Sequence, residues 1–136
     1  MNISVKKSTE ISLDKENSIE KVEETLLNDI AEIALAHFRA GFSNNGRGQV
    51  DGSSGWFLKS GKPTNLYING HLLNSIEYKI EENTITIYIN DNKAPYGYYH
   101  QYGIGKQTKK PILGHSTELN NQVTKLIKDK IKNIFS

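Results

Sequence analysis

The chain has 136 residues, of which 36% are hydrophobic and 24% charged, and its formal net charge is +2. This length and composition predict a single domain, residues 1–136, and exclude a largely disordered chain. The absence of cysteine excludes disulfides and thiolate metal sites. No apolar run approaches the roughly 20 residues that span a bilayer, so we expect no membrane association.

Charge is distributed unevenly along the chain. Residues 1–32 contain 4 Lys and 8 Asp or Glu, a net of −4, whereas residues 33–103 contain 6 Lys or Arg and 5 Asp or Glu, a net of +1. Residues 104–136 contain 7 Lys and 2 Asp or Glu, a net of +5. An acidic and a basic surface on one subunit suit head-to-tail packing of identical copies. Two solvated helix faces are an equally good interpretation.

The first predicted element is a helix from about Ser18 to Ala40, preceded by a flexible arm at residues 1–16. Gly41 is the expected C-terminal stop of this helix. Its apolar residues recur at steps of three and four and form one stripe: Ile19, Val22, Leu26, Ile30 and Ile33.

A long polar segment follows. Residues 43–55 contain four glycines and show no apolar periodicity, which predicts a mobile loop. A lone Trp at the end of such a loop is expected to anchor it to the core, and Trp56 stands there. Leu66-Tyr67-Ile68 is expected to be a short strand or an extended lead-in. A helical turn at residues 70–75 should then turn Leu72 and Ile76 inward as two further core anchors.

The middle of the chain carries strand signals. Two runs alternate apolar and polar residues around the turn Glu82-Asn83, which predicts a β-hairpin. A period of two places the apolar residues on one buried face: Ile76, Tyr78, Ile80, Ile85, Ile87 and Ile89. A third strand is expected near residues 96–102.

A second long loop is predicted at residues 103–115, followed by a helix from about Ser116 to Phe135 with lysines crowding its C-terminal half. The order helix, strands, helix predicts an α+β fold. We expect an antiparallel β-sheet packed against a long N-terminal helix and a C-terminal helix.

Five sequence features follow one another between residues 56 and 116. Trp56 with Leu58 comes first, then a Gly-x-Leu-x-x-Ser-Ile pattern at 70–76, then the hairpin. The sequence PYGYYHQYG follows at 95–103, and a basic loop, KKPILG, at 109–114. In this order the chain resembles the phage virion morphogenesis family, the tail-completion or neck proteins of tailed bacteriophages. It departs from the family pattern at Gly97, Tyr102 and Lys110, where that pattern has Ala, Phe and Arg.

The resemblance implies a structural virion protein without catalysis. It would be a tail-completion or head–tail connector subunit in the neck, assembled in the host cytoplasm. Its implied partners are further copies of itself in a ring, expected to be six-fold, and the adjacent neck and tail proteins. A tail terminator protein and a small basic nucleic-acid-binding module are the alternatives.

The tyrosine-rich segment is the predicted subunit interface, because tyrosine offers a large contact area with a polar tip. As a strand, it would present alternate residues on two faces and leave through a tight turn. The predicted interface residues are Tyr96, Tyr98, Tyr99, His100, Gln101, Tyr102 and Gly103. A half-buried edge strand with its hydroxyls in water is the alternative.

The basic loop after this segment is predicted to be exposed. Lys106, Lys109 and Lys110 would contact DNA passing through a channel, in a salt-dependent way, or pair with the acidic helix of a neighbour. A plain solvated loop is the alternative. His71, His100 and His115 match no standard metal-binding spacing. We therefore expect no metal, no cofactor and no catalytic residue, and we expect His100 to tie its strand to the loop by a hydrogen bond.

Overall fold

The computed structural model describes residues 10–12, 20–66, 70–103 and 108–134. Most of the expected strand or lead-in at 66–68 lies outside these residues. The described elements are β1 (Glu10–Ser12), α2 (Glu20–Arg39), α3 (Gly41–Asn44), α4 (His71–Ser75), β2 (Ile76–Glu81), β3 (Thr84–Ile89), α5 (Gly97–Tyr102) and α6 (Thr117–Ile134).

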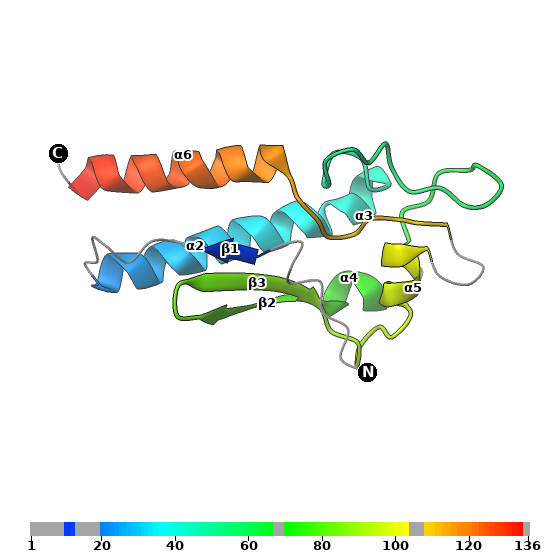
Figure 1. Cartoon of the computed structure of the whole chain (residues 1–136), viewed down its shortest axis with the longest axis horizontal. Coiled ribbons are helices and arrows are strands. Elements are labelled where there is room, and N and C mark those ends of the chain that lie inside the picture. Colours follow the sequence, from blue (N-terminus) through cyan, green and yellow to red (C-terminus); the bar gives the residue numbers. More distant parts are fainter. Residues whose placement is uncertain (1–9, 13–19, 67–69, 104–107, 135–136) are drawn as a thin grey trace.

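The layers of the molecule confirm the predicted α+β class. An antiparallel sheet packs against α2, and α6 lies along α2 on the side away from the sheet (Figure 1). Within the described ranges, no helix is sufficiently long and apolar to cross a bilayer.

The predicted hairpin is confirmed, with Ile76 opposite Ile89 and Glu81 opposite Thr84. The third strand, however, is not the tyrosine segment. It is β1, which pairs with β3 through Ile11 opposite Ile85, so the strand order is β1-β3-β2. The prediction that residues 1–16 form a flexible arm is therefore wrong at Glu10–Ser12. Pairing with β1 supplies hydrogen-bond partners to the backbone of β3 that an open edge would leave unpaired.

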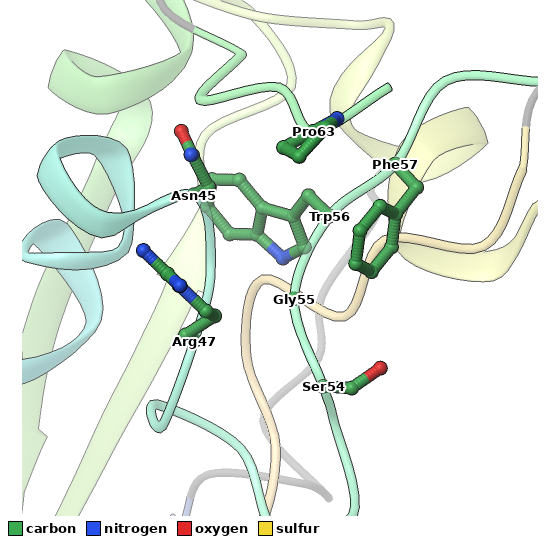
Figure 2. A pocket seen from close by; sticks show the side chains of 7 residues that line it. All are labelled: Asn45, Arg47, Ser54, Gly55, Trp56, Phe57 and Pro63. Atoms are coloured by element: carbon green, nitrogen blue, oxygen red, sulfur yellow. The ribbon is translucent and has the colours of Figure 1, made fainter. Parts of the chain in front are cut away.

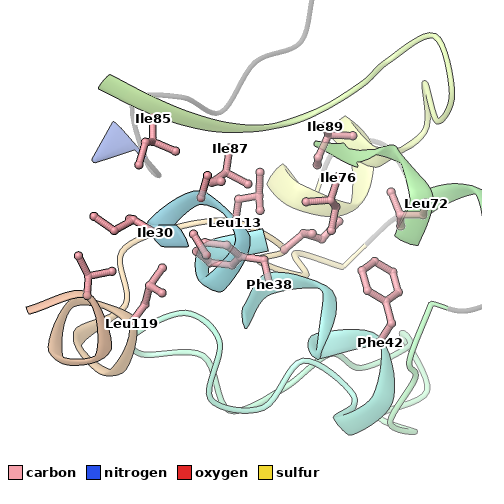
Figure 3. Close-up of a cluster of buried hydrophobic side chains, with 14 of the residues drawn as sticks. Ile30, Phe38, Phe42, Leu72, Ile76, Ile85, Ile87, Ile89, Leu113 and Leu119 are labelled. Carbon is pink, nitrogen blue, oxygen red and sulfur yellow. The ribbon is translucent and has the colours of Figure 1, made fainter. Parts of the chain in front are cut away.

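The core lies between α2 and the sheet, and the three predicted anchors are buried in it: Trp56, Leu72 and Ile76. Figure 3 shows Ile30 and Phe38 of α2 facing the isoleucines of β2 and β3, with Leu119 of α6 at one side. The buried face of the strands, formed by every second residue, and the buried face of α2, formed by residues three and four apart, therefore pack together in one apolar layer.

Helix α2 ends at Arg39, beside the predicted end at Ala40. Gly41 is not a left-handed cap, however; it is the first residue of α3, and the left-handed residue is Asn45, at φ 61°. Packing favours glycine at position 41, because a Cβ there would lie 3.0 Å from the indole ring of Trp56, closer than an ordinary contact.

Helix α6 begins where predicted. The Ser116 hydroxyl caps it by accepting a hydrogen bond from the backbone N–H of Leu119 at 3.1 Å. Phe135, the predicted last residue, lies outside the described residues. Helices α2 and α6 run antiparallel, which brings the acidic start of α2 beside the lysine-rich end of α6 (Figure 1). Lys130 accordingly lies 3.7 Å from Asp29 in the same chain. The two charged segments therefore compensate each other inside one subunit, which weakens the case for their joining neighbouring copies.

Candidate interface at the α5 end

The tyrosine-rich segment is a short helix, and the predicted strand at 96–102 is wrong. Gly97–Tyr102 form α5, which ends at Gly103 in the left-handed conformation at φ 65°. Gly97 and Gln101 face the protein, and their spacing of four residues is that of one helix face. At Gly97 a Cβ would lie 3.0 Å from the Ile89 side chain. The burial of these two residues selects the helix over the strand.

Three tyrosines point away from this buried face. Tyr96, Tyr99 and Tyr102 are 38%, 48% and 43% exposed. Their spacing of three residues places them together on the outer side of α5, so the two faces predicted for a strand do not exist. The side chain of Tyr98 lies outside the described part of the structure.

Gln101 belongs to the interior and not to the interface, contrary to the prediction. Its Oε1 accepts hydrogen bonds from the backbone N–H groups of Ile112 and Leu113 at 2.7 and 3.0 Å. Its Nε2 donates to the Leu113 carbonyl at 2.8 Å. The buried amide thus pairs with an extended segment as a neighbouring strand would, and it fastens residues 112–113 to α5.

Gly103 is likewise required for close packing rather than for contact with a partner. A Cβ at this position would lie 2.8 Å from the backbone nitrogen of Lys109, in a conformation that L side chains rarely adopt. Gly103 is half-buried, and the absence of a side chain there allows Lys109 to lie close to the end of α5.

The prediction that Lys110 is exposed is wrong. Lys110 is only 1% exposed, and its Nζ donates to the Thr108 carbonyl at 3.2 Å. The hydrogen bonds of Gln101 hold residues 112–113 against the core, and Lys110, two residues before them, is buried as a result. Burial lowers the pKa of its ammonium group below the ordinary value. Lys110 is therefore not a DNA-channel contact, whereas Lys109 is exposed and Lys106 lies outside the described residues.

His100 is half-buried, and its ring meets that of Tyr96 edge-on at 6.2 Å. Its Nδ1 is buried without a hydrogen-bond partner in the described part of the chain. The predicted tie to the loop exists, but the backbone makes it: the His100 carbonyl accepts the Lys110 N–H at 2.7 Å. Burial, and secondarily the charge of Lys110, lower the pKa of His100. His100 therefore has the environment of a neutral structural imidazole.

A second exposed element adjoins α5, and the sequence did not predict it. Residues 57–63 form a small hairpin in which the Leu58 N–H donates to the Lys62 carbonyl at 2.8 Å and Phe57 bridges Pro63. Phe57 and Leu58 are 38% and 44% exposed. The Thr108 hydroxyl donates to the Phe57 carbonyl at 2.5 Å and so joins this hairpin to the segment that follows α5. The one sequence signal was the apolar pair itself, placed between a Trp and a Lys-Ser-Gly turn.

These elements gather at one end of the molecule (Figure 1), which we call the α5 end: α5 with Tyr96 directly before it, the 57–63 hairpin and residues 108–110. Among the described residues, five of the six exposed large hydrophobic side chains lie here, and the sixth is Ile131 on α6. Clustered exposed aromatic side chains are typical of protein–protein contact sites. The α5 end is therefore the best candidate for an interface.

A pocket of about 220 Å³ lies beside the hairpin (Figure 2). Among the described residues that line it, Arg47 alone is ionisable, and the indole of Trp56 and the ring of Phe57 form much of its wall. Such a lining lacks the paired acid and base that hydrolytic chemistry requires.

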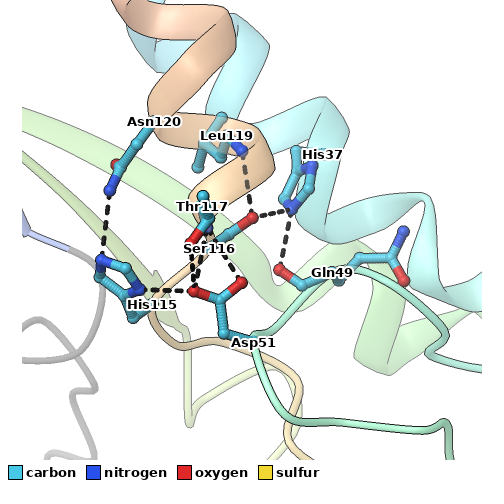
Figure 4. Close-up of polar contacts among 8 residues, drawn as sticks. All are labelled: His37, Gln49, Asp51, His115, Ser116, Thr117, Leu119 and Asn120. Atoms are coloured by element: carbon cyan, nitrogen blue, oxygen red, sulfur yellow. Dashed lines mark hydrogen bonds and ion pairs between the residues drawn. The ribbon is translucent and has the colours of Figure 1, made fainter.

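The segment predicted as a mobile loop is fastened to α6 (Figure 4). Asp51 accepts hydrogen bonds from the Thr117 N–H at 3.0 Å, the Thr117 hydroxyl at 2.7 Å and His115 Nδ1 at 2.8 Å. The Thr117 backbone and hydroxyl bonds, followed by that of His115, lower the pKa of Asp51 from 3.8 to about 2. Sequence reasoning missed this clamp because its partners are more than 60 positions apart.

Ser116, His37 and Asp51 lie near one another but do not form a catalytic triad (Figure 4). His37 Nε2 lies 2.8 Å from the Gln49 carbonyl, which can only accept, so this nitrogen carries a proton. It therefore cannot take one from the Ser116 hydroxyl at 3.1 Å. Asp51 bonds a different histidine. His71, His100 and His115 do not gather into a metal-binding group within the described residues.

Comparison with known proteins identifies no relative: no family model, curated protein or solved structure matches the chain. The function proposed below therefore depends on the geometry of the α5 end and on the motif order between residues 56 and 116.

Proposed function

We propose that this protein is a structural subunit of the neck of a tailed bacteriophage. It is a tail-completion or head–tail connector protein that forms a ring of identical copies, and it acts by contact and not by catalysis. In this proposal it is assembled in the host cytoplasm and remains in the virion, bound to adjacent neck and tail proteins. The observation that carries the proposal is the exposed aromatic surface of the α5 end.

The support beneath these aromatic side chains favours an assembly role. The Gln101 amide, the His100 carbonyl and the Thr108 hydroxyl each bond a backbone group of a neighbouring segment. The backbone that carries the exposed tyrosines is therefore held in place by hydrogen bonds to neighbouring segments. A preorganised surface loses less conformational entropy on association than a flexible loop does, so more of its contact energy appears as affinity.

The burial of Lys110 changes one part of the expected role. A channel-lining function would need the lysines of this segment to face solvent, and Lys110 does not. Nonspecific attraction to passing DNA is thus a weaker part of the proposal than contact between proteins.

Sedimentation velocity of the purified protein, alone and mixed with neck and tail components, tests the proposal. We expect a ring-sized species for the wild type and its loss in the double variant Tyr99→Ser/Tyr102→Ser. Ile131→Ser is the matched control, because Ile131 is similarly exposed, at 49%, but lies on α6 away from the α5 end. A wild type that stays monomeric in every mixture would refute the proposal.

The alternatives give different results. A tail terminator would bind the end of a tail tube but not the portal side of the joint. A nucleic-acid-binding module would retain DNA on a filter, with an affinity that falls steeply as salt rises.

A further inference from the structure

The α5 end is cationic as well as aromatic. The 57–63 hairpin, residues 96–102 and residues 108–110 contain four lysines and no Asp or Glu, and of these four only Lys110 is buried. Lys59 and Lys62 in the hairpin and Lys109 beside α5 are exposed, as is the nearby Arg47. Two such ends facing each other would place like charges in contact, which is unfavourable. A self-complementary contact between two α5 ends is therefore disfavoured, and the surface that docks here should present carboxylates.

The opposite end of the same chain presents them. The turn between β2 and β3 and the beginning of α2 lie at the end of the molecule away from α5 (Figure 1). Glu81, Glu82 and Glu24 are exposed there. Glu82 occupies the turn at φ 55°, and the side chain of Glu81 is 71% exposed, with Lys79 as an ion-pair partner at 3.3 Å.

The β2–β3 turn takes no part in the pairing of charges between α2 and α6. The lysine-rich end of α6 lies along α2, where Lys130 faces Asp29. The β2–β3 turn lies on the other side of α2, beyond the reach of this pairing (Figure 1). In the described part of the chain Glu81 pairs with Lys79, whereas Glu82 beside it makes no ion pair, so the turn keeps an uncompensated carboxylate at its tip.

We infer that the α5 end of one copy docks on the β2–β3 turn of the next copy. This inference rests on the proposed ring and names its two contact surfaces. Because the surfaces differ and lie at opposite ends, the contact is heterologous, and each copy uses each surface once. Repetition of such a contact produces a closed ring when the rotation between copies closes. The aromatic side chains supply contact area, and the opposite charges of the lysines and glutamates determine which surface of one copy faces which surface of the next.

Cysteine cross-linking tests the pairing directly, because the chain contains no cysteine of its own. The variant Lys62→Cys mixed with the variant Glu82→Cys should form a disulfide-linked dimer under mild oxidation. The double variant should give a ladder of covalent species that ends at the copy number of the ring. Lys62→Cys mixed with Glu118→Cys is the control, because Glu118 is an exposed glutamate at the start of α6. This control pair should not cross-link above the level of either variant alone.

Charge reversal provides a second measurement. Lys59→Glu/Lys62→Glu and Glu81→Lys/Glu82→Lys should each abolish ring formation, and a chain carrying all four changes should recover it. Glu82→Asn serves as a milder variant, because Asn tolerates a left-handed backbone, and it should weaken assembly while circular dichroism shows an unchanged fold.

The outcomes separate the inference from the proposed function. If wild-type rings form but the Lys62–Glu82 pair does not cross-link and the turn variants assemble normally, the inference is wrong and the ring proposal stands. If the wild type remains monomeric in every mixture, both are wrong. If the α5 end cross-links instead to another neck protein, or retains DNA, its partner is not a second copy and the inference is also overturned.

Discussion

Gln101→Leu is the substitution that most sharply separates a structural residue from an interface residue. Leucine has a similar volume but cannot replace the three hydrogen bonds of the buried amide. The N–H groups of Ile112 and Leu113 and the Leu113 carbonyl would each lose a partner. An unsatisfied buried polar group costs about 1–3 kcal/mol, so the free energy of unfolding should fall by about 3–5 kcal/mol if water partly replaces the lost bonds.

This loss is a large share of the roughly 5–15 kcal/mol by which domains are stable. For a domain of this size, each kcal/mol shifts Tm by about 3–5 °C, which predicts a fall of about 10–20 °C. Urea unfolding followed by circular dichroism measures the free energy, with Gln122→Leu as the control. Gln122 is exposed on α6, so its replacement should change stability by less than about 0.5 kcal/mol.

A contrary result is easy to recognise. If Gln101 were a contact residue, as its place in the motif predicted, Gln101→Leu would weaken assembly and leave the stability of the monomer unchanged. A loss below about 1 kcal/mol would refute the bracing role of the amide, because one ordinary hydrogen bond already contributes about that much.

Three further predictions concern burial, pH and backbone conformation. Lys110→Met should raise the midpoint of urea unfolding, because it removes a buried ammonium group that has one carbonyl partner in the described structure. Stability should fall as pH drops from about 4 to about 2, because the pKa of Asp51 is lowered from 3.8 to about 2 by folding, and Asp51→Asn should flatten this decline in acid-unfolding curves. Gly46→Ala should destabilise far more than Gly48→Ala in thermal melts. Both glycines have positive φ, but only the Cβ at position 46 would overlap the indole of Trp56.

Each of these has a result that would count against it. A Lys110→Met variant less stable than the wild type would show that the ammonium group makes a net favourable contact. If the stability of Asp51→Asn falls with decreasing pH as steeply as that of the wild type, another carboxylate is responsible. Glu77 is the next candidate, because its pKa is also lowered, chiefly by Lys93. Equal losses at positions 46 and 48 would mean that backbone strain, and not the Trp56 contact, determines the cost.

The sequence by itself determined the elements that have a local period. Helices α2 and α6 and the β2–β3 hairpin were predicted because their apolar residues repeat at the spacing of one face, and that repeat requires no knowledge of distant residues. The predicted start of α6 near Ser116 was confirmed, as was the burial of Leu72 and Ile76. The burial of Trp56 was predicted for a different reason, because a lone Trp at the end of a loop commonly anchors it to the core. The α+β class follows from the order of these elements.

Only the tertiary structure decided the rest. The tyrosine segment is a helix because Gly97 and Gln101 fit against the core, and the strand that completes the sheet comes from Glu10–Ser12. The loop at 43–55 is held by Asp51, and Lys110 is buried because Gln101 binds the residues that follow it. Each of these features depends on a contact between different segments of the chain, which no local pattern of residues records. The free energy of such contacts outweighs the weak local preference of a short polar segment, which carries no period of its own.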